Sequence, residues 1–538
     1  MSADKLFLGN IVTMEPGKPV QEAMTVKDGM VQFVGTRAVA QDLCDEDTQV
    51  VDFGQNYIYP GTLEGHCHPD LAGIRLALQA DLTAGTSMAE FVDMMKAFID
   101  ERPGADEYRG AGWVELDCKP TAAMLDAICP DIPVALNSID GHSMWLNTAA
   151  MERYGINQAA VEEWGTDCIR VDEQGNPTGY ISEGPAFKIT GTMSYTAEQK
   201  EAAFLAWQDF AFSQGLTAVM HAGVMEEACQ IYQSLIDKGL WKLRTYGVFL
   251  LDEHEPDYVA KVKYIKELAE KYNSEYFQII GVKVFMDGVV EGHTAWMLDP
   301  YNDDPTATGV KRMSDFERFT DALVAATEEG LLIHCHTIGD GAVKFAIDCM
   351  EAAQKRAGDF TARHAMCHLQ CMRPEDVQRM ADLRITPVVA PLWATKDPTY
   401  LDMFKVYIGD ERIEPMYPIK AFLDAGAHVA FHTDFPVSTL MGVPRTVYIA
   451  ETRRGPEMAP ENALNPEGES ISRMDALAGL TTGTAYSVKQ EDHLGQLTPG
   501  FVANMVVFDQ DFLTADIEDV PQAKLLATII DGETVYSA

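Results

Sequence analysis

The sequence is short of basic residues. It has 41 Lys and Arg against 82 Asp and Glu in 538 residues, a formal net charge of −41 at pH 7. A field of that sign repels phosphate backbones and anionic lipid headgroups. Nucleic acid and membrane surfaces are therefore excluded as expected partners, and the acidic excess is interpreted as a solvated surface that keeps the protein soluble.

The sequence also lacks a segment typical of exported proteins and a cysteine pattern typical of disulfide-linked domains. The first residues have no basic region followed by a long apolar region, and no apolar run approaches the length needed to span a bilayer. The 10 cysteines include no CxxC pair, in a chain large enough to fold without disulfides. These absences predict a cytoplasmic protein with reduced thiols.

No GxGxxG opens a helical pattern, and no internal repeat is visible. Instead, strand-like runs that end in polar residues alternate with helical patterns at residues 314–329 and 341–357. About four hundred residues of such units favour a (β/α)8 barrel over a doubly wound sheet. The predicted fold class is therefore α/β, with a TIM-like barrel at its centre.

The two ends of the chain share a different sequence pattern, in which short apolar strands are separated by turns. The tripeptide at residues 27–29 indicates a hairpin. Neither end has enough strands to bury both faces of a sheet, so we expect both ends to join into one discontinuous β-sandwich domain. The predicted boundaries are residues 1–58 and 495–538 for that domain and 59–494 for the barrel, with a helical insertion at about 71–119.

Residues 59–70 place His66 and His68 two positions apart behind a short apolar run. Residues i and i+2 of a strand point the same way, so both imidazoles can bind one metal ion. In a chain with 13 histidines such a pair also arises by chance, and two unrelated histidines remain the alternative. The adjacent thiol of Cys67, like those of Cys335 and Cys367 beside later histidines, is expected to face outward.

In barrel enzymes the reactive side chains project from the carboxyl ends of the strands. Polar residues recur at these predicted ends, namely Lys283, His336, His368 and Asp434. Together with the HxH pair, this order predicts a binuclear metal site. His334, two residues before His336, is a rival ligand because it can face the same way.

Several local motifs carry a resemblance to a known family. They are residues 282–288 (VKVFMDG), 336–340 (HTIGD), 433–437 (TDFPV), 497–504 (LTPGFVAN) and 140–147 (DGHSMWLN). With the HxH pair, they make the chain resemble the amidohydrolase superfamily, in the branch that contains N-substituted formamide deformylase-like hydrolases. The resemblance covers nearly the whole chain.

The resemblance implies a ligand set. His66, His68 and Asp434 would bind one metal ion, His336 and His368 the other, and Lys283 would lie between them. An ammonium group is costly in an apolar strand and cannot bind a cation until it loses its proton. Carboxylation by carbon dioxide, common in the family, would solve both problems; an unmodified Lys283 paired with Asp287 is the alternative.

Other residues are candidates for substrate binding, each with a structural alternative. His142 lies in the matched segment 140–147, and its alternative is a structural histidine. His293 and Trp296 follow the strand of Lys283. The alternative for His293 is a histidine in a surface loop, and the alternative for Trp296 is a tryptophan packed in the core. The further candidates are Trp393, His221 and His432. The last two depart from the pattern of the branch, as do Glu64 and Cys367.

The expected reaction is hydrolysis of a non-peptide C–N bond of amide or formamide type. The nucleophile would be a hydroxide held between two divalent cations. Zn²⁺ is the favoured ion because the expected ligands are imidazoles and a carboxylate. Asp434 would move the proton from the hydroxide to the leaving nitrogen. A cyclic amidase, deaminase or esterase on the same metals is the alternative, followed by a non-catalytic scaffold. The substrate is expected to be a small molecule, and the oligomeric state, including a homodimer, stays open.

Overall fold

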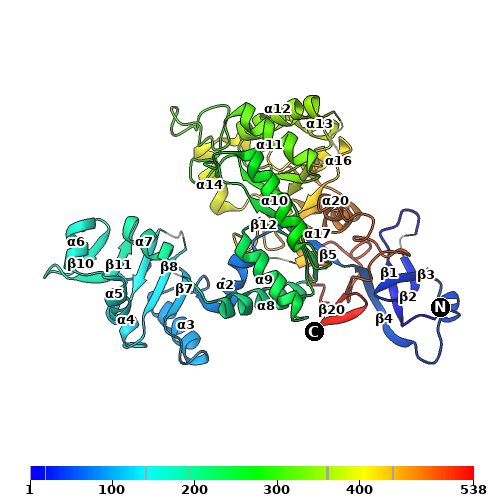
Figure 1. Cartoon of the computed structure of the whole chain (residues 1–538), viewed down its shortest axis with the longest axis horizontal. Helices are drawn as coiled ribbons and strands as arrows, with labels where there is room; N and C mark the ends of the chain where they lie inside the picture. Colours follow the sequence, from blue (N-terminus) through cyan, green and yellow to red (C-terminus); the bar gives the residue numbers. More distant parts are fainter. Residues whose placement is uncertain (1, 19, 140–141, 193, 359–362, 439–441) are drawn as a thin grey trace. The chain divides into compact units, whose positions relative to one another are not determined.

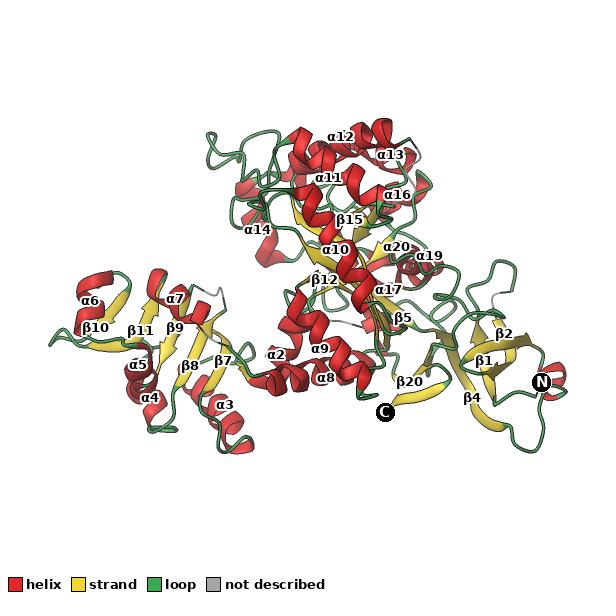
Figure 2. Cartoon of the chain, in the orientation of Figure 1, coloured by secondary structure: helices red, strands yellow, loops and turns green. Residues whose placement is uncertain are grey.

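The computed structural model describes residues 2–18, 20–139, 142–192, 194–358, 363–438 and 442–538 (Figures 1 and 2). The chain divides into two compact units. One contains Met1–His68 and Gln208–Ala538, and the other contains Pro69–Trp207. Among the described helices, none combines the length and the apolar character needed to cross a bilayer.

The first unit contains a sheet of eight strands in which all neighbouring pairs are parallel. In order around the sheet the strands are β5 (Thr62–Cys67), β12 (Leu216–Val224), β13 (Arg244–Leu250), β14 (Phe277–Phe285), β15 (Leu332–Thr337), β16 (Ala365–His368), β17 (Thr386–Val389) and β18 (Ala430–Phe431). This sheet forms a (β/α)8 barrel, and it confirms the predicted fold class.

Gly65 explains how closely the first and last strands of the barrel can approach. A Cβ atom at this position would lie 2.6 Å from the carbonyl oxygen of Phe431 on β18. Any larger residue would push β18 away from β5. A glycine between Glu64 and His66 therefore allows the barrel to close at the strand that leads into the HxH pair.

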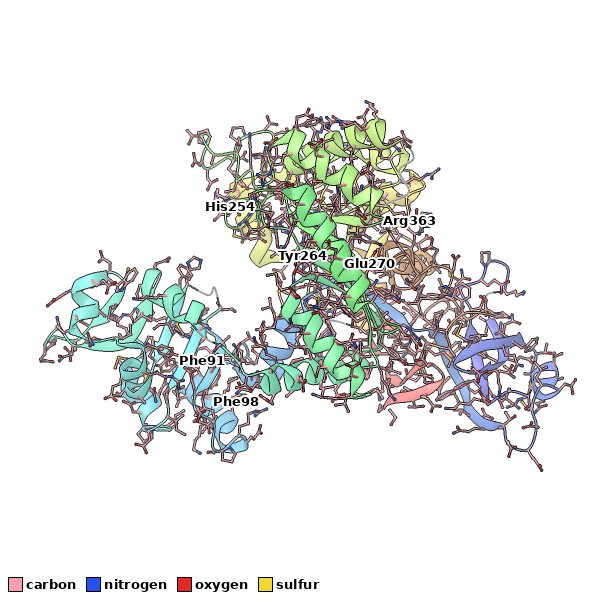
Figure 3. All side chains as sticks on the ribbon, viewed as in Figure 1. Phe91, Phe98, His254, Tyr264, Glu270 and Arg363 are labelled. Carbon is pink, nitrogen blue, oxygen red and sulfur yellow. The ribbon has the colours of Figure 1, made fainter. Side chains whose placement is uncertain are left out.

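Helices that follow the strands cover the outside of the barrel. They include α9 (Glu226–Asp237), α10 (Tyr258–Tyr272), α11 (Phe316–Glu328), α12 (Asp340–Ala357), α13 (Pro374–Asp382) and α16 (Ile419–Asp424). α11 begins where the Asp315 side chain accepts a hydrogen bond from the amide of Arg318, and it buries Phe319, Leu323 and Ala326 at helical spacing. Tyr264 is exposed on α10 (Figure 3). The helices predicted at 314–329 and 341–357 are confirmed by α11 and α12.

The described part of the first unit contains further α-helices. They are α1 (Arg37–Gln41), α14 (Pro398–Tyr407), α15 (Asp410–Ile413), α17 (Gly442–Thr452), α18 (Pro466–Glu469), α19 (Arg473–Leu480) and α20 (Thr482–Ser487); α8 (Ala197–Ser213) leads into the unit from the preceding residues. Gly483 on α20 lies against the carbonyl oxygen of Val429, just before β18, where a Cβ atom would come within 1.9 Å. This contact seats α20 directly against the end of the barrel.

The two ends of the chain form one seven-stranded sheet. Its order is β21 (Glu533–Ser537), β20 (Leu525–Ile530), β19 (Met505–Phe508), β4 (Gln49–Pro60), β1 (Lys5–Val12), β2 (Val20–Lys27) and β3 (Met30–Gly35). Tyr59 pairs with Val506, which links the N-terminal and C-terminal strands. β2 and β3 form the predicted hairpin, and its turn residues Asp28 and Gly29 both have positive φ, as a type I′ turn requires.

Alternation along β1 gives this sheet two apolar faces. Phe7 and Ile11 belong to a large core with residues from both chain ends, such as Met505 and Ile529. Leu6 and Leu8 belong to a smaller cluster that includes Ala40 of α1. The larger core can form only when both ends of the chain are in place.

The second unit, Pro69–Trp207, is built around a six-stranded sheet rather than helices alone. Its strands in order are β10 (Ile169–Val171), β11 (Pro177–Ser182), β9 (Ser143–Leu146), β8 (Val134–Ser138), β7 (Tyr108–Trp113) and β6 (Gln79–Asp81), with helices α2 (Pro69–Leu78), α3 (Met88–Glu101), α4 (Ala122–Asp126), α5 (Thr148–Tyr154), α6 (Gln158–Trp164) and α7 (Gly184–Thr192). Phe91 of α3, shown with Phe98 in Figure 3, packs in a core with Trp113 and Trp145.

This second unit differs from the helical insertion expected at about 71–119. That stretch contains α2 and α3, but it also contains β6 and β7 and is less than half of the unit. β6 has three residues, and β7 carries glycines at Gly110 and Gly112. Such short or glycine-containing strands give no clear period-two pattern, so the sequence did not reveal the sheet.

A buried histidine next to the barrel predicts how stability changes with pH. His364 precedes β16, and its Nδ1 atom accepts a hydrogen bond of 2.9 Å from the amide of Ile333. Burial lowers the pKa of His364 from 6.5 to about 3. A lowered imidazole pKa gives a stabilisation that is complete above pH 6.5 and is lost as the pH falls toward 3, with about 2 kcal/mol lost by pH 5.

We therefore expect His364→Asn, which keeps an acceptor near the Nδ1 position, to show a weaker loss of unfolding free energy between pH 7.5 and pH 5 than the unsubstituted protein. Chemical denaturation at several pH values measures this difference. The control is His254→Asn, because the His254 side chain is 87% exposed (Figure 3). Equal pH dependence in all three proteins would contradict the assignment.

Candidate metal centre

The HxH pair at the end of β5 faces Asp434, which follows β18. The Nε2 atoms of His66 and His68 lie 3.3 Å and 3.2 Å from the same carboxylate oxygen, Oδ1 of Asp434. The backbone reinforces this contact, because the amide of Asp434 donates to the carbonyl of His66 and the amide of His68 donates to the carbonyl of Phe435. Residues from the first and last strands of the barrel thus converge on one point.

The other predicted ligands lie beside this group. The ring of His368, at the end of β16, is centred 5.0 Å from the ring of His66 and 4.6 Å from the ring of His336 on β15. Nζ of Lys283 on β14 lies 3.5 Å from Nε2 of His66. The six side chains therefore meet at the carboxyl end of the barrel, although they come from five strands or strand ends.

Two of these residues sit in a backbone conformation that is unusual for non-glycine residues. His368 has φ of 74° and Asp434 has φ of 60°. The left-handed conformation costs roughly 1–2 kcal/mol for a residue with a Cβ atom. Each residue turns the chain sharply as it leaves its strand, and the turn directs the side chain toward the other donors.

The turn at His368 corrects one prediction. Cys367 was expected to face away from the site because its neighbour faces toward it, but Sγ of Cys367 lies 3.5 Å from Nζ of Lys283. Alternation applies only while the strand continues, and the positive φ of His368 ends it. Cys367 and His368 can therefore both face the interior.

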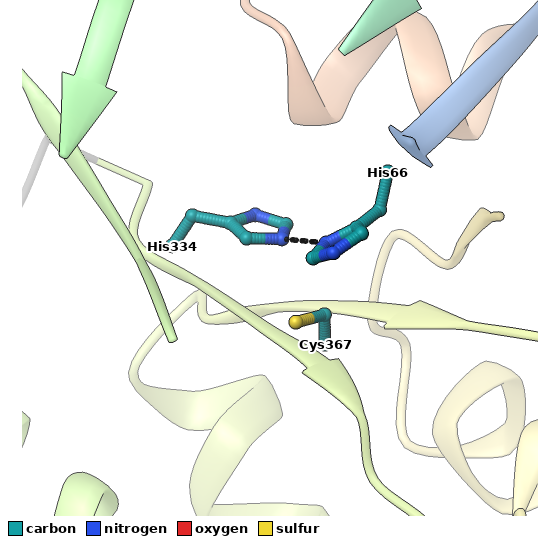
Figure 4. A group of neighbouring side chains, drawn as sticks. All are labelled: His66, His334 and Cys367. Atoms are coloured by element: carbon teal, nitrogen blue, oxygen red, sulfur yellow. Dashed lines mark hydrogen bonds between the residues drawn. The ribbon is translucent and has the colours of Figure 1, made fainter. Parts of the chain in front are cut away.

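His334, the rival to His336, has a position of its own. Its Nε2 atom lies 2.7 Å from Nδ1 of His66, and both side chains are fully buried (Figure 4). His336 lies two residues further along β15, where Nε2 hydrogen-bonds the carbonyl of Gly288 at 3.0 Å. The two histidines of β15 therefore contact different parts of the centre.

Burial sets the protonation of these groups. Burial lowers the pKa of His336 to about 3 and that of His432 to about 4. It also holds the pKa values of His66, His334 and His368 well below 6.5. The nearby Lys283 charge is a further cause for most of these histidines. Burial alone would raise the pKa of Asp434, but the adjacent His68, His368 and His432 lower it below its usual value. The histidines are thus neutral and the carboxylate is ionised, which are the states that bind metal.

The centre contains buried polar atoms that the rest of the protein does not satisfy. Within the described residues, no well-aligned hydrogen bond reaches either ring nitrogen of His368 or His432, Nδ1 of His334, or Oδ1 of Asp434. Each such atom costs about 1–3 kcal/mol when it has no partner. Imidazole nitrogens and carboxylate oxygens are suitable ligands for Zn²⁺ and similar cations, so the residues present fit a divalent metal ion.

Comparison with known proteins agrees with this geometry. The model of the family described as "Amidohydrolase family" matches residues 49–536. The chain belongs to the amidohydrolase family.

Several relatives of this amidohydrolase are distant in sequence but align over nearly its whole length. Protein LONG AFTER FAR-RED 3 of Arabidopsis thaliana is 26% identical over 98% of this chain and 90% of its own. N-substituted formamide deformylase of Arthrobacter pascens is 23% identical over 98% of this chain and 97% of its own. A crystal structure of an uncharacterized metal-dependent hydrolase from Pyrococcus horikoshii OT3 superposes with a TM-score of 0.76, at 24% identity over 95% of this chain and 99% of that chain.

Two of the predicted substrate-binding residues of this amidohydrolase lie directly at the centre. The ring of Trp393 stacks on that of His368, with centroids 5.4 Å apart and an interplanar angle of 21°. The ring of His432 is centred 5.0 Å from His368 and 5.5 Å from Trp393. The departure from the family pattern at His432 therefore adds an imidazole to the wall of the metal centre.

Two other candidates occupy the loop after β14. Nε2 of His293 lies 2.9 Å from a carboxylate oxygen of Asp303, and its side chain is 30% exposed. The ring of Trp296 packs against Phe345 of α12, and its backbone amide donates to Asp287. Substrate binding by His293 and Trp296 stays a prediction.

The last two candidates have partners elsewhere. Nδ1 of His221 lies 3.0 Å from the hydroxyl of Tyr232 on α9, so this face of the ring meets the helix layer. His142 belongs to the second unit, where it is exposed and lies 3.3 Å from Glu183. Residues 140 and 141 of its matched segment are outside the described residues. Substrate binding by His142 and His221 stays a prediction.

Glu64 is a residue of the centre that was not among the predicted site residues. Its carboxylate is buried and accepts hydrogen bonds from the amide of His66 at 3.0 Å and from the amide and hydroxyl of Thr433 at 2.9 Å and 2.8 Å. Burial raises its pKa to about 8. Glu64 thus ties the HxH strand to the turn that carries Asp434, and an acidic residue inside an apolar strand was the available signal.

Asp287 plays a similar part on the opposite side. It accepts hydrogen bonds from the backbone amides of Trp296, Ile338 and Gly339, and burial raises its pKa to about 7. A Cβ atom at Gly339 would lie 2.1 Å from the carbonyl oxygen of Trp296, so only glycine fits there. Asp287 therefore fixes the loop that follows His336, a role distinct from the expected alternative of pairing with Lys283.

Proposed function

We propose that this amidohydrolase hydrolyses an amide or formamide-type, non-peptide C–N bond of a small molecule at a centre for two divalent cations, with zinc favoured by the ligands. In this proposal His66, His68 and Asp434 hold one ion, His336 and His368 hold the other, and a carboxylated Lys283 lies between them. The observation that carries it is the meeting of two imidazoles, of His66 and His68, at one buried carboxylate oxygen of Asp434.

A bound divalent cation brings the pKa of water toward about 7 and polarises a substrate carbonyl. Asp434 is the group placed to move the proton. Its carboxylate is ionised because the neighbouring histidines lower its pKa, and it is nine-tenths buried, so little solvent competes for it. Asp434 would accept a proton from the attacking water and donate it to the leaving nitrogen, which is otherwise a poor leaving group.

The surroundings of the centre support a small organic substrate. Trp393 and His432 offer a flat aromatic surface and a neutral imidazole beside His368. An aromatic wall of this kind binds an apolar N-substituent, while a neutral imidazole can accept or donate one hydrogen bond. The relative named N-substituted formamide deformylase supports the choice of bond, because it aligns over 98% of this chain.

A substrate screen with metal analysis tests the proposal. The full chain, produced with zinc and bicarbonate, is assayed on N-substituted formamides, N-acyl amino acids, cyclic ureas and simple esters, and its metal content is measured by elemental analysis. We expect bound zinc and turnover of at least one open-chain amide or formamide. Turnover restricted to cyclic ureas or esters would contradict the proposed bond, and protein without metal under these conditions would contradict the centre itself.

A further inference from the structure

Three donor side chains converge beside the contact between the HxH pair and Asp434. They are His66 from β5, His334 from β15 and Cys367 from β16, and the nitrogen and sulfur atoms they offer lie within 4.8 Å of one another (Figure 4). The exposed fractions of the three residues are 1%, 0% and 0%. Such a set of two imidazoles and one thiol has the composition of a transition-metal site.

His66 has two ring nitrogens, and each faces a different set of donors. Its Nε2 atom lies 3.3 Å from Asp434, on the side of His68. Its Nδ1 atom lies 2.7 Å from Nε2 of His334. A neutral imidazole carries a proton on one of these nitrogens, so ligation through both requires the ring to lose that proton.

His334 and Cys367 both have capacity to bind. Within the described residues, no hydrogen bond reaches Nδ1 of His334, and its Nε2 has only the ring of His66 as partner. The thiol of Cys367 donates a hydrogen bond of 3.2 Å to the carbonyl of Cys335, and Nζ of Lys283 lies 3.5 Å away. Burial raises the pKa of the Cys367 thiol to about 12, so the bound ion itself has to displace the thiol proton.

The distances match an ion-free form of such a site. Two nitrogens on one tetrahedral Zn²⁺, each with a bond of about 2.0–2.1 Å, lie about 3.3 Å apart. Nδ1 of His66 and Nε2 of His334 are 2.7 Å apart because they share a proton, so ligation requires these two atoms to separate by roughly 0.6 Å. Small changes in the side-chain torsions provide this movement without a shift of the strands.

We propose that His66 Nδ1, His334 Nε2 and Cys367 Sγ bind a transition-metal ion of borderline or soft character, such as Zn²⁺, separate from the ion held by His68 and Asp434. Three bonds to the ion form. The thiol proton of Cys367 and the proton between the two rings pass to solvent, and His334 keeps its proton on Nδ1. The His66 ring thereby becomes an imidazolate that bridges the two ions when both are bound. Filling of this site is independent of the reaction proposed above.

X-ray absorption spectroscopy of the zinc-loaded full chain tests the proposal directly. We expect a sulfur neighbour at about 2.3 Å from zinc. Cys367→Ser and Cys367→Ala should remove this sulfur signal and reduce the zinc content by one ion per chain. The second of these variants decides the matter if the first does not fold, as judged by circular dichroism and thermal unfolding.

Two controls separate this site from the rest of the protein. Cys349→Ser removes another fully buried thiol, on α12, and should leave the sulfur signal unchanged. His68→Ala removes a ligand of the other donor set, so it should lower activity and keep the sulfur signal. A zinc-loaded wild type with only nitrogen and oxygen neighbours, or a sulfur signal that persists in both Cys367 variants, would overturn the proposal.

Discussion

Asp434→Asn is expected to lower kcat about 10³-fold while the protein keeps most of its metal, because positioned acid–base groups contribute about 10²–10⁴-fold. The amide cannot accept the proton of the attacking water, so the leaving nitrogen would depart unprotonated. The imidazoles of His66 and His68 remain, and the amide oxygen can still take the place of Oδ1. The measurement is kcat on a substrate found in the screen, together with elemental analysis of the purified variant.

The matched control for this variant is Asp424→Asn, which neutralises an exposed carboxylate on α16 that pairs with Lys420. It should have wild-type activity. Undiminished turnover in Asp434→Asn would reject the proton-transfer role. Loss of metal together with activity would assign Asp434 to metal binding alone.

Lys283→Met is expected to lower metal affinity by about 10²-fold or more and to remove most activity, since groups that organise a metal site often contribute 10–100-fold. Lys283 is fully buried, and methionine nearly keeps its volume, so a failure to fold is not the expected cause of the loss. If the lysine is carboxylated, wild-type protein prepared with ¹³C-labelled bicarbonate should show a carbamate carbon signal in NMR spectra that the variant lacks.

A small carboxylate supplies a further test of the same lysine. Lys283→Ala leaves a space at the centre that acetate or propionate can enter, so millimolar amounts of either acid should restore part of the activity if a carbamate normally lies there. Lys344→Ala is the control, because Lys344 pairs with Asp348 on the outside of α12. A carbamate-free wild type that is fully active would show that the unmodified amine is sufficient.

The barrel and the meeting of the six candidate ligands could be predicted because both depend on simple rules. Strands of a parallel barrel all end on the same face, so polar residues such as Lys283 and His336 at the ends of successive strands must come together. The HxH pair needs only the alternation of a strand. These rules hold wherever the chain follows regular secondary structure.

The same rules failed where the backbone leaves regular structure. Cys367 was wrongly predicted to face outward because the conformation of His368, with φ of 74°, ends the strand one residue later. Nothing in the sequence of residues 363–370 indicates that a histidine there adopts a positive φ. The hydrogen bond between His66 and His334 could not be predicted from the sequence either, because it depends on how deep each side chain lies in the barrel.

The second unit escaped prediction for another reason. Strand β6 has only three residues, and β7 includes two glycines, so neither gives a recognisable pattern without its neighbours in the sheet. The position of His142 in that unit could not be predicted either. Long-range pairing, rather than local preference, decides such structure.

The left-handed residues at the mouth of the barrel place a limit on how this enzyme can be engineered. Glycine at position 368 or 434 would relieve the conformational cost of a side chain at positive φ and is the obvious choice in a search for thermostable variants. In the proposed centre, each such replacement would also delete a metal donor. If that proposal holds, glycine favours heat resistance at these two positions and the native residue favours turnover, so a screen for heat resistance alone would select proteins with impaired catalysis.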